Sequence, residues 1–326
     1  MSKNLKTILI GTTLTAGSEE IARTGALIAR AAGATPWLVH AYNLEAFPSE
    51  LGAFEESWIE KQTTALREAM TRQADSTGLA TVPGFGGDQS CLVLGTPYRV
   101  ILDLARKIRA DLIVLGASEG GAIQRAFLGS TADRVIRKAP CPVLVLRPGA
   151  EIPPRRVMIP VDFSTVSASA FRFGMTFLKL IGNGKPIETE ALFVLNLLEA
   201  EGSLQFTPNQ IGRFAGDELA RFVKENAPAD TVSHQVLLGY PREEILREME
   251  ERRSELAILG THGRSGFERM MLGSIASQVL QRAHCNVLVV PPTVTVEEDE
   301  SAEKKAVAGA DWEFVSDESP LPAVRS

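Results

Sequence analysis

The sequence contains one pattern twice, and this duplication constrains the fold more than any other feature. Leu-Gly-Thr-Pro at 94–97 recurs as Leu-Gly-Tyr-Pro at 238–241. Compared without a gap, residues 94–148 and 238–292 are identical at 21 of 55 positions, at a constant offset of 144. Solenoid repeats span only about 20–50 residues, so an offset of this size indicates a duplicated domain.

Each copy alternates short apolar segments with longer amphipathic ones, which predicts strands joined by helices in a parallel sheet. In the first copy we expect strands at 7–10, 37–41, 91–94, 112–115 and 143–146, and helices at about 18–32, 50–76, 97–109 and 130–139. In the second we expect strands at 157–161, 191–195, 235–238, 256–259 and 287–290, and helices at about 167–181, 208–226, 241–252 and 274–283. The predicted fold is α/β, with two similar open parallel-sheet domains in tandem at 1–148 and 153–292, joined by a stiff proline-rich spacer.

The net charge of −6 comes from the C-terminal tail, residues 293–326, which holds nine acids and three bases. Residues 1–292 have 31 acidic and 31 basic side chains. A neutral body lacks the excess of Lys and Arg that non-specific nucleic-acid binding requires, so we expect no nucleic-acid partner. The tail is predicted to be disordered, with a docking motif around Trp312 as the alternative.

Cysteine usage and the absence of long apolar runs both point to the cytoplasm. Cys91, Cys141 and Cys285 form no C-x-x-C pair, which argues against disulfides and zinc. Cys141 and Cys285 precede equivalent strands, and packing is the favoured interpretation over redox sensing. The apolar stretch 7–10 is too short for a signal peptide, and no run approaches the 18 residues needed to span a membrane.

One loop carries the residues best suited to bind a ligand. It runs from Gly260 to Ser274, follows an apolar strand and leads into a helix. Glycines allow close backbone approach to a phosphate, and a helix N-terminus offers unpaired N–H groups and a positive dipole end. Ser274 suits both a helix cap and a phosphate donor, and Arg264 adds a fixed positive charge. The alternative is that the glycines only form a tight turn. Standard dinucleotide and P-loop motifs are absent.

The spacing G-x2-G-x9-G-S, set directly after a strand, resembles the ATP-binding motif of the universal stress protein family. The flanking segments 239–246 and 283–290 also look like family sequence, and the resemblance covers everything except the tail. It implies a tandem universal stress protein with a Rossmann-like, nucleotide-binding α-hydrolase-like fold. ATP, with or without Mg²⁺, is the implied ligand of the second domain. The residues implied to form the site are Pro160, Val161, Asp162, Leu195, Gly260, Thr261, His262, Gly263, Arg264, Gly273, Ser274 and Ile275.

Within this set, Asp162 is expected to accept hydrogen bonds from the ribose hydroxyls, with an Asx turn or a helix cap as the alternative. The backbone near Leu195 is placed at the adenine edge by resemblance alone. His262 either orients a phosphate or is an ordinary polar loop residue. No catalytic constellation and no metal site can be assembled from the spacing of the His, Cys and acidic residues.

The first copy departs from the motif at three ligand-facing positions. Thr13 stands in place of Asp162, Glu119 in place of Gly263, and Gly120 in place of Arg264. A carboxylate at 119 crowds and repels phosphates, at a cost of roughly 0.8 kcal/mol in water and several times more when partly buried. We therefore expect the first copy to bind no triphosphate or to bind another ligand, and binding stays open because Gly120 and Gly121 keep its loop flexible.

The sequence thus favours an ATP-binding cytoplasmic protein of stress response or regulation. One alternative is a slow ATPase or a phosphoryl- or adenylyl-transfer enzyme, against which stands the lack of an evident base. The other is an interaction scaffold with two vestigial sites. We expect the final strands, 143–146 and 287–290, to pair as an intrachain pseudo-dimer, because exposed apolar sheet edges are normally protected. A homodimer of the whole chain and an unidentified protein partner remain open, and no membrane partner is expected.

Overall fold

The structure is a computed structural model of the 326-residue chain. It describes residues 5–43, 56–117, 128–149, 151–196, 208–227, 232–261 and 272–292. The predicted acidic tail lies outside these residues.

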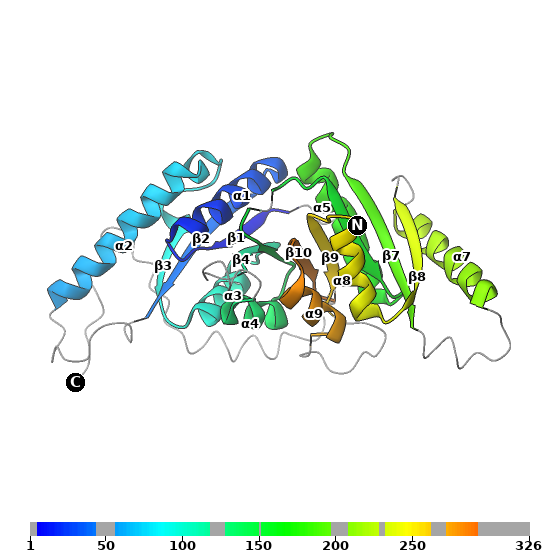
Figure 1. The fold of residues 1–326 in the computed structure, drawn as a ribbon. Coiled ribbons are helices and arrows are strands. Elements are labelled where there is room, and N and C mark those ends of the chain that lie inside the picture. Colours follow the sequence, from blue (N-terminus) through cyan, green and yellow to red (C-terminus); the bar gives the residue numbers. More distant parts are fainter. Residues whose placement is uncertain are drawn as a thin grey trace.

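The first half alternates strands and helices in the predicted order (Figure 1). Its elements are β1 (Thr7–Gly11), α1 (Ala16–Ala32), β2 (Thr35–Tyr42), α2 (Glu56–Ser76), β3 (Ser90–Leu94), α3 (Pro97–Lys107), β4 (Leu112–Gly116), α4 (Ser130–Lys138) and β5 (Val143–Leu146). Two short 3₁₀ turns, Leu79–Thr81 and Gly87–Gln89, precede β3 and were not expected from the sequence.

The second half repeats the order. Its elements are β6 (Arg156–Val161), α5 (Thr165–Gly182), β7 (Glu188–Asn196), α7 (Pro208–Asn226), β8 (Ser233–Gly239), α8 (Pro241–Glu251), β9 (Leu256–Gly260), α9 (Ser274–Arg282) and β10 (Asn286–Val290). Pro97 and Pro241 each stand at the start of a helix, where the missing N–H removes no intrahelical bond.

The strands of both halves form one ten-stranded sheet in the order β3-β2-β1-β4-β5-β10-β9-β6-β7-β8. Within each half the described strands pair in parallel, which confirms the predicted fold class. The first strand of each half lies between the second and the fourth, so the strand order reverses between β1 and β4 and again between β6 and β9.

The halves meet where β5 pairs with β10 in antiparallel register. Leu144 lies opposite Leu288, with Val143 opposite Val289 and Val145 opposite Val287. The predicted pairing of the two final strands is confirmed. Because Leu144 and Leu288 also differ by the repeat offset of 144, they lie on the pseudo-two-fold axis that relates the halves.

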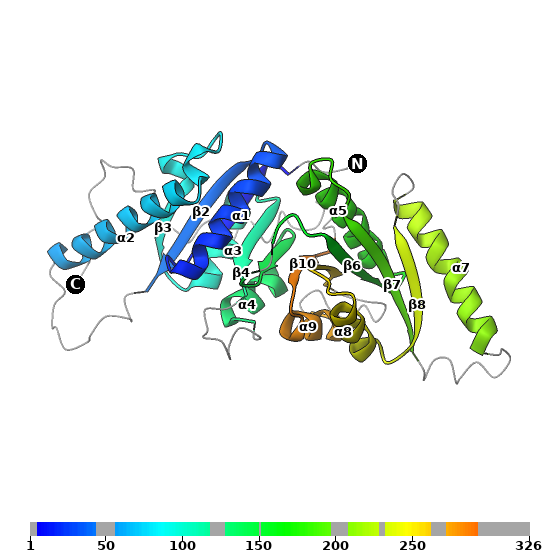
Figure 2. The ribbon, with the colours of Figure 1, turned by 45° about the horizontal axis from the view of Figure 1, so that its top comes forward.

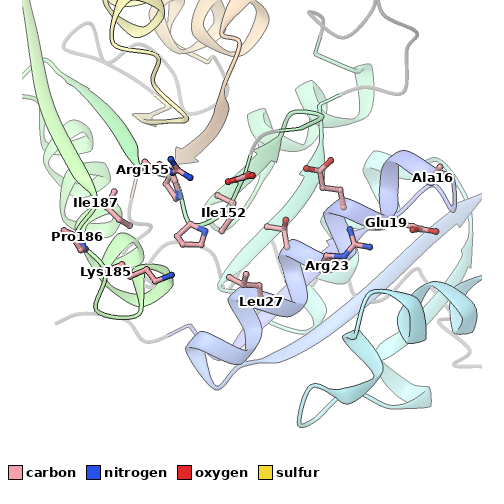
Figure 3. A pocket seen from close by; sticks show the side chains of 14 residues that line it. Ala16, Glu19, Arg23, Leu27, Ile152, Arg155, Lys185, Pro186 and Ile187 are labelled. Atoms are coloured by element: carbon pink, nitrogen blue, oxygen red, sulfur yellow. The ribbon is translucent and has the colours of Figure 1, made fainter.

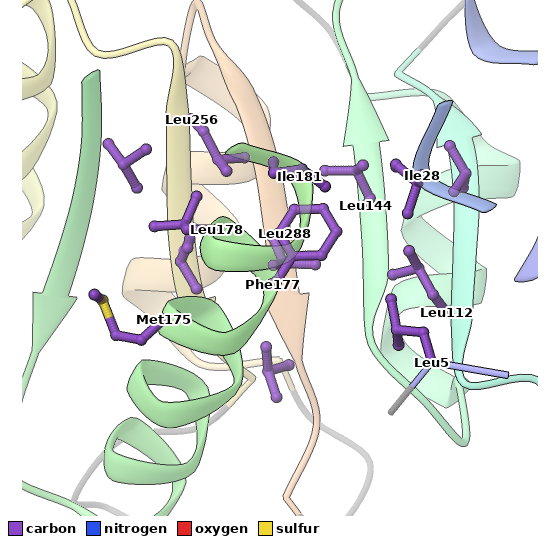
Figure 4. Packing of buried hydrophobic residues seen from close by; sticks show 14 of the residues in the cluster. Leu5, Ile28, Leu112, Leu144, Met175, Phe177, Leu178, Ile181, Leu256 and Leu288 are labelled. Atoms are coloured by element: carbon purple, nitrogen blue, oxygen red, sulfur yellow. The ribbon is translucent and has the colours of Figure 1, made fainter. Parts of the chain in front are cut away.

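Helices cover both faces of the sheet. Helices α1, α2, α5 and α7 lie on one face and α3, α4, α8 and α9 on the other, while α2 and α7 mark opposite ends of the molecule (Figures 1 and 2). Strands β4, β5, β9 and β10 are almost wholly buried, as parallel strands covered on both faces should be. Figure 4 shows Leu144, Leu288 and Phe177 packed together across the junction.

Glycine lets α1 pack tightly on β1, which leads to the first prediction. A Cβ added at Gly25 would lie 2.3 Å from Cδ1 of Ile10, whereas one added at Gly212 in α7 meets nothing within 4 Å. Gly25→Ala is expected to destabilise the protein by about 1–3 kcal/mol through overpacking. Gly212→Ala should instead stabilise it by up to about 1 kcal/mol through helix propensity. Urea unfolding of both variants tests this, and a stable Gly25→Ala variant would contradict the packing account.

Candidate functional site

Those predicted site residues of the second half that the structure describes lie around the point where the strand order reverses. Asp162 follows β6, Thr261 follows β9, and these two strands are neighbours in the sheet. In open α/β sheets, the crevice at the carboxyl ends of the strands on either side of such a reversal is where ligands bind. Leu195, near the end of β7, is half-buried one strand further along.

Asp162 shapes the turn between β6 and α5. Its Oδ1 accepts a hydrogen bond from the backbone N of Ser164 at 3.0 Å, and its own N–H donates to Oγ of Ser167 at 3.3 Å. Ser164 caps α5, accepting from the backbone N of Ser167 at 3.1 Å. The Asx turn named as the alternative for Asp162 is therefore present. The carboxylate is only half-buried, and a ribose contact stays a prediction.

Aromatic packing fixes this turn from below. Phe163 has a φ of 63° and stacks obliquely on Phe193 of β7, with centroids 4.4 Å apart. The ring of Phe163 also packs on Phe222 of α7, with centroids 5.6 Å apart. The ring of Phe222 packs edge-on against Phe171 of α5, with centroids 5.5 Å apart. The left-handed conformation of a bulky residue costs free energy that this packing offsets, so the position of the adjacent Asp162 is strongly constrained.

The ends of the glycine loop are tied together by backbone hydrogen bonds. The N–H of Gly273 donates to the carbonyl of Thr261 at 2.7 Å, and the N–H of Thr261 donates to the carbonyl of Val290 at 3.1 Å. The first half has the same arrangement, from Gly129 to Ala117 and from Ala117 to Leu146. In both halves the loop is therefore closed at its two ends by the same pair of backbone hydrogen bonds.

Gly260 has a packing role that the sequence did not reveal. A Cβ at this position would lie 2.9 Å from Cγ1 and 3.4 Å from the carbonyl oxygen of Val166, in the first turn of α5. The absence of a side chain at Gly260 thus lets β9 and α5 approach each other, whatever ligand the site holds.

Of the two roles that suit Ser274, the structure does not assign it the helix cap, because the cap of α9 is Gly273 and the helix begins at Ser274, as expected. Gly273 has φ −56° and ψ 149° and makes no side-chain capping bond. Any residue can adopt these angles, so backbone conformation does not require glycine here. With no acidic residue in its first turn, α9 presents N–H groups beside exposed Ser274 and half-exposed Ile275.

The remaining predicted residues divide into two groups. Pro160 is half-buried and Val161 is buried at the end of β6, so these residues would form part of the site through their backbone atoms. His262, Gly263 and Arg264 lie outside the described residues, as do Glu119 and Gly120 of the first half.

The two halves can be superposed in register at this turn. Leu14 has a φ of 62°, matching the 63° of Phe163, so the structure places Thr13 at the position of Asp162. Thr13 is exposed, and its hydroxyl contacts that of Thr15 at 3.1 Å. The replacement inferred from the sequence is thus correct in position, and the first half lacks a carboxylate there.

The first half has a further difference that the sequence reasoning missed. The first turn of α4 contains Asp133, which makes two 2.9 Å hydrogen bonds to Arg137. Its counterpart at the offset of 144 is Ser277, which is uncharged. A carboxylate in the first turn competes with an anionic ligand for the helix N-terminus, and the repeat alignment could have revealed it.

A cavity of about 670 Å³ lies elsewhere, between α1, the segment Glu151–Arg155 and the turn from α5 to β7 (Figure 3). It is lined by residues of both signs, among them Glu19, Glu20, Arg23 and Lys185, and by apolar groups including Leu27 and Ile187. None of the predicted site residues lines it. With no dominant charge, it forms a crease between the halves rather than an anion site.

Within the described residues, no three His, Cys, Asp or Glu side chains are grouped so that they could hold a metal ion. In the same part of the chain, every helix is too short or too polar to cross a bilayer.

All three cysteines are buried and form no disulfide with one another, which leads to the second prediction. Burial raises the pKa of Cys285 to about 12 and that of Cys91 to about 11. Both thiols therefore stay neutral near pH 8 and should react far more slowly with a thiol reagent in native than in denatured protein. Because folding raises both pKa values, burying the neutral thiols contributes its full stabilisation below the ordinary pKa of 9.0. This stabilisation is lost as the pH rises from 9.0 toward the folded pKa values. Rapid labelling of native protein would contradict this account.

A family model described as "Universal stress protein family" matches residues 4–147 and 154–291. The universal stress protein Rv2005c of Mycobacterium tuberculosis is 28% identical over 207 residues, covering 62% of this chain and 68% of that protein. The universal stress protein MJ0531 of Methanocaldococcus jannaschii is 32% identical over 143 residues, covering 42% of this chain and 81% of that protein.

Among solved structures, the chain is similar to the crystal structure of a universal stress protein from Archaeoglobus fulgidus. The TM-score is 0.61 with 17% identity, covering 88% of this chain and 98% of that one. At this identity the similarity concerns the fold alone.

Proposed function

Because the chain belongs to the universal stress protein family, we propose that it is an ATP-binding regulatory protein of the cytoplasmic stress response that holds its nucleotide in the second half. The observation that carries this proposal is the convergence at one strand-order reversal of three features. These are the half-buried carboxylate of Asp162, the hydrogen-bonded ends of the loop at Thr261 and Gly273, and the N-terminus of α9, whose cap Gly273 has no side chain to occupy its N–H groups.

Each feature suits a different part of a nucleotide. The N–H groups at Ser274 and Ile275 can donate to phosphate oxygens, and the dipole of α9 favours their negative charge. Glycine at 273 is not required by its backbone angles, which supports a role in close approach by a ligand. Asp162 places a carboxylate, an acceptor suited to ribose hydroxyls, at the end of β6, and the backbone of β7 near Leu195 lies one strand away.

The loop segment at His262, Gly263 and Arg264 completes the proposed site. Gly263 would leave room for the phosphates and Arg264 would add positive charge. Any Mg²⁺ would arrive bound to the phosphates, since the described residues offer no cluster of metal ligands.

The first half is proposed to bind no ATP and to serve as the structural partner of the second. In this view residues 1–148 and 153–292 are the two domains of an intrachain pseudo-dimer. Thr13 replaces the carboxylate of Asp162 with a hydroxyl, Asp133 occupies the first turn of α4, and Glu119 replaces the glycine of the motif.

The experiment that tests the proposal is mass spectrometry of the nucleotide released when protein purified without added ligand is denatured. We expect ATP, at no more than one per chain. Steady turnover of added ATP by the purified protein would favour a slow ATPase or transferase instead. No released nucleotide and no binding of added ATP would favour a scaffold.

A further inference from the structure

We propose that the junction between β5 and β10 is built to accept unlike halves only, so that the surface on each half fits the other half of the chain and not a second copy of itself. This goes beyond the proposed function, because it concerns which surface pairs with which and does not depend on any nucleotide.

The side chains at the centre of the junction do not distinguish the unlike half from a second copy of the same half. Both strands carry Val-Leu-Val, and in the paired register each valine lies opposite a valine while Leu144 lies opposite Leu288. If two first halves or two second halves paired through the same edge, the same side chains would meet in the same register. The contact between these strand side chains would therefore be as favourable in a like pairing as in the observed one.

The two ends of the junction differ, and they carry the specificity. At one end, the backbone N–H of Arg147 donates to Oδ1 of Asn286 at 2.8 Å. Both residues are buried, with exposed fractions of 4% and 0%. At the offset of 144, the counterpart of Arg147 is Pro291 and the counterpart of Asn286 is Pro142. The other end thus has two prolines, neither of which can donate through its backbone N.

The Arg147 side chain adds a second contact that only the observed pairing provides. Its Nη2 donates to the carbonyl oxygen of Leu280 at 2.5 Å, in the last turn of α9. A guanidinium is favourable at this end of a helix, where carbonyl groups lack intrahelical partners. Proline at the matching position, 291, makes no such contact to the other helix.

A like pairing would leave polar groups buried without partners at both ends. Two second halves would place Asn286 against Pro291 twice, so neither amide oxygen would receive a backbone N–H. Two first halves would place Arg147 against Pro142 twice, so neither backbone N–H of Arg147 would have a side-chain amide oxygen to donate to. Each such buried orphan lowers the population of a pairing about fivefold to a hundredfold.

Stability alone does not explain the buried amide. Nδ2 of Asn286 is buried and has no hydrogen-bond partner in the part of the chain that the structure describes. A half-satisfied buried amide is less favourable than an apolar side chain that packs equally well. In coiled coils, a single buried asparagine lowers stability but selects the partner and the register. Asn286 is placed to act in the same way at this junction.

The test uses the full chain with its three cysteines replaced by alanine and a reporter at the pseudo-two-fold axis. In a Leu288→Cys chain, pairing of two second halves would bring the two new thiols together and give a covalent dimer on mild oxidation. In the chain that also carries Leu144→Cys, the observed pairing gives an internally cross-linked monomer instead. Both chains are refolded from denaturant at the same high protein concentration before oxidation.

The decisive variant is Pro291→Ala, with Pro142→Ala as its matched control. Alanine at 291 supplies the N–H that Asn286 lacks in a pairing of two second halves, and it leaves the contact between Arg147 and Asn286 untouched. We expect Pro291→Ala to raise the covalent dimer fraction of the Leu288→Cys chain at least fivefold, while Pro142→Ala leaves it unchanged. An unchanged dimer fraction in Pro291→Ala, or an equal rise in both variants, would overturn the proposal.

Discussion

The Gly263→Glu variant is expected to bind ATP more weakly than the wild type, by about tenfold to a hundredfold or more. The substitution gives the second half the glutamate that the first half has at Glu119. Loss of one charge-assisted hydrogen bond costs about 1.5–3 kcal/mol, which corresponds to this range, and the added carboxylate repels the phosphates further. Calorimetric titration of the folded variant gives the measurement.

Two companion variants separate a local effect from a general one. Gly121→Glu adds the same charge to the first-half loop and should leave ATP binding unchanged. Glu119→Gly should restore little binding to the first half, because Thr13 still provides no carboxylate. Unaltered ATP affinity in Gly263→Glu, with an unchanged circular dichroism spectrum, would exclude the proposed phosphate site.

Phe171→Ala is expected to lower the free energy of unfolding by about 3–5 kcal/mol. Phe171 is completely buried and meets the ring of Phe222 edge-on, in the cluster that supports the Asp162 turn. The truncation removes buried apolar area and leaves a cavity among rigid neighbours, so the second half should lose both stability and definition of its ligand site. Urea unfolding followed by circular dichroism measures the first effect, and ATP titration measures the second.

Phe214→Ala is the matched control for this variant. Phe214 lies on α7 and is 60% exposed, so its truncation should change stability by no more than about 0.5 kcal/mol. Equal losses in the two variants would contradict the account in which Phe171 is part of a tightly packed aromatic cluster beneath the Asp162 turn.

The sequence was sufficient for the fold because its local and long-range patterns agree. Apolar segments bounded by glycine and proline located the strands, and the boundaries of β5 match the structure at both ends. The repeat offset then led to the antiparallel pairing, because a duplicated chain has two copies of the same apolar edge to cover. The helix expected from 167 begins at Thr165, because the cap provided by Ser164 lies before the first turn of the apolar pattern.

The candidate site was predicted less completely, because several of its residues act through packing that spacing does not report. The proximity of Gly260 to Val166 depends on how α5 crosses β9, and the support of Asp162 by Phe193 and Phe222 depends on two other elements. The sequence did not distinguish a capping role for Ser274 from a ligand-binding one, because serine suits both, and the structure places the cap at Gly273.

The buried amide of Asn286 was also invisible in the sequence. In a linear pattern it is a polar residue before a strand, and only the pairing of β5 with β10 brings it to Arg147. Contacts of this kind join residues more than a hundred positions apart, so they follow from the tertiary arrangement and not from periodicity.

The central claim, that the two halves are alike in fold and unlike in ligand binding, is tested most directly by the stoichiometry of ATP binding. Calorimetric titration of nucleotide-free wild-type protein should give one site per chain, and Asp162→Asn should weaken that site about tenfold while keeping the turn intact. Thr13→Ala, the same position in the first half, should leave the titration unchanged. Two equivalent sites per chain, or a titration that responds to Thr13→Ala and not to Asp162→Asn, would contradict the account.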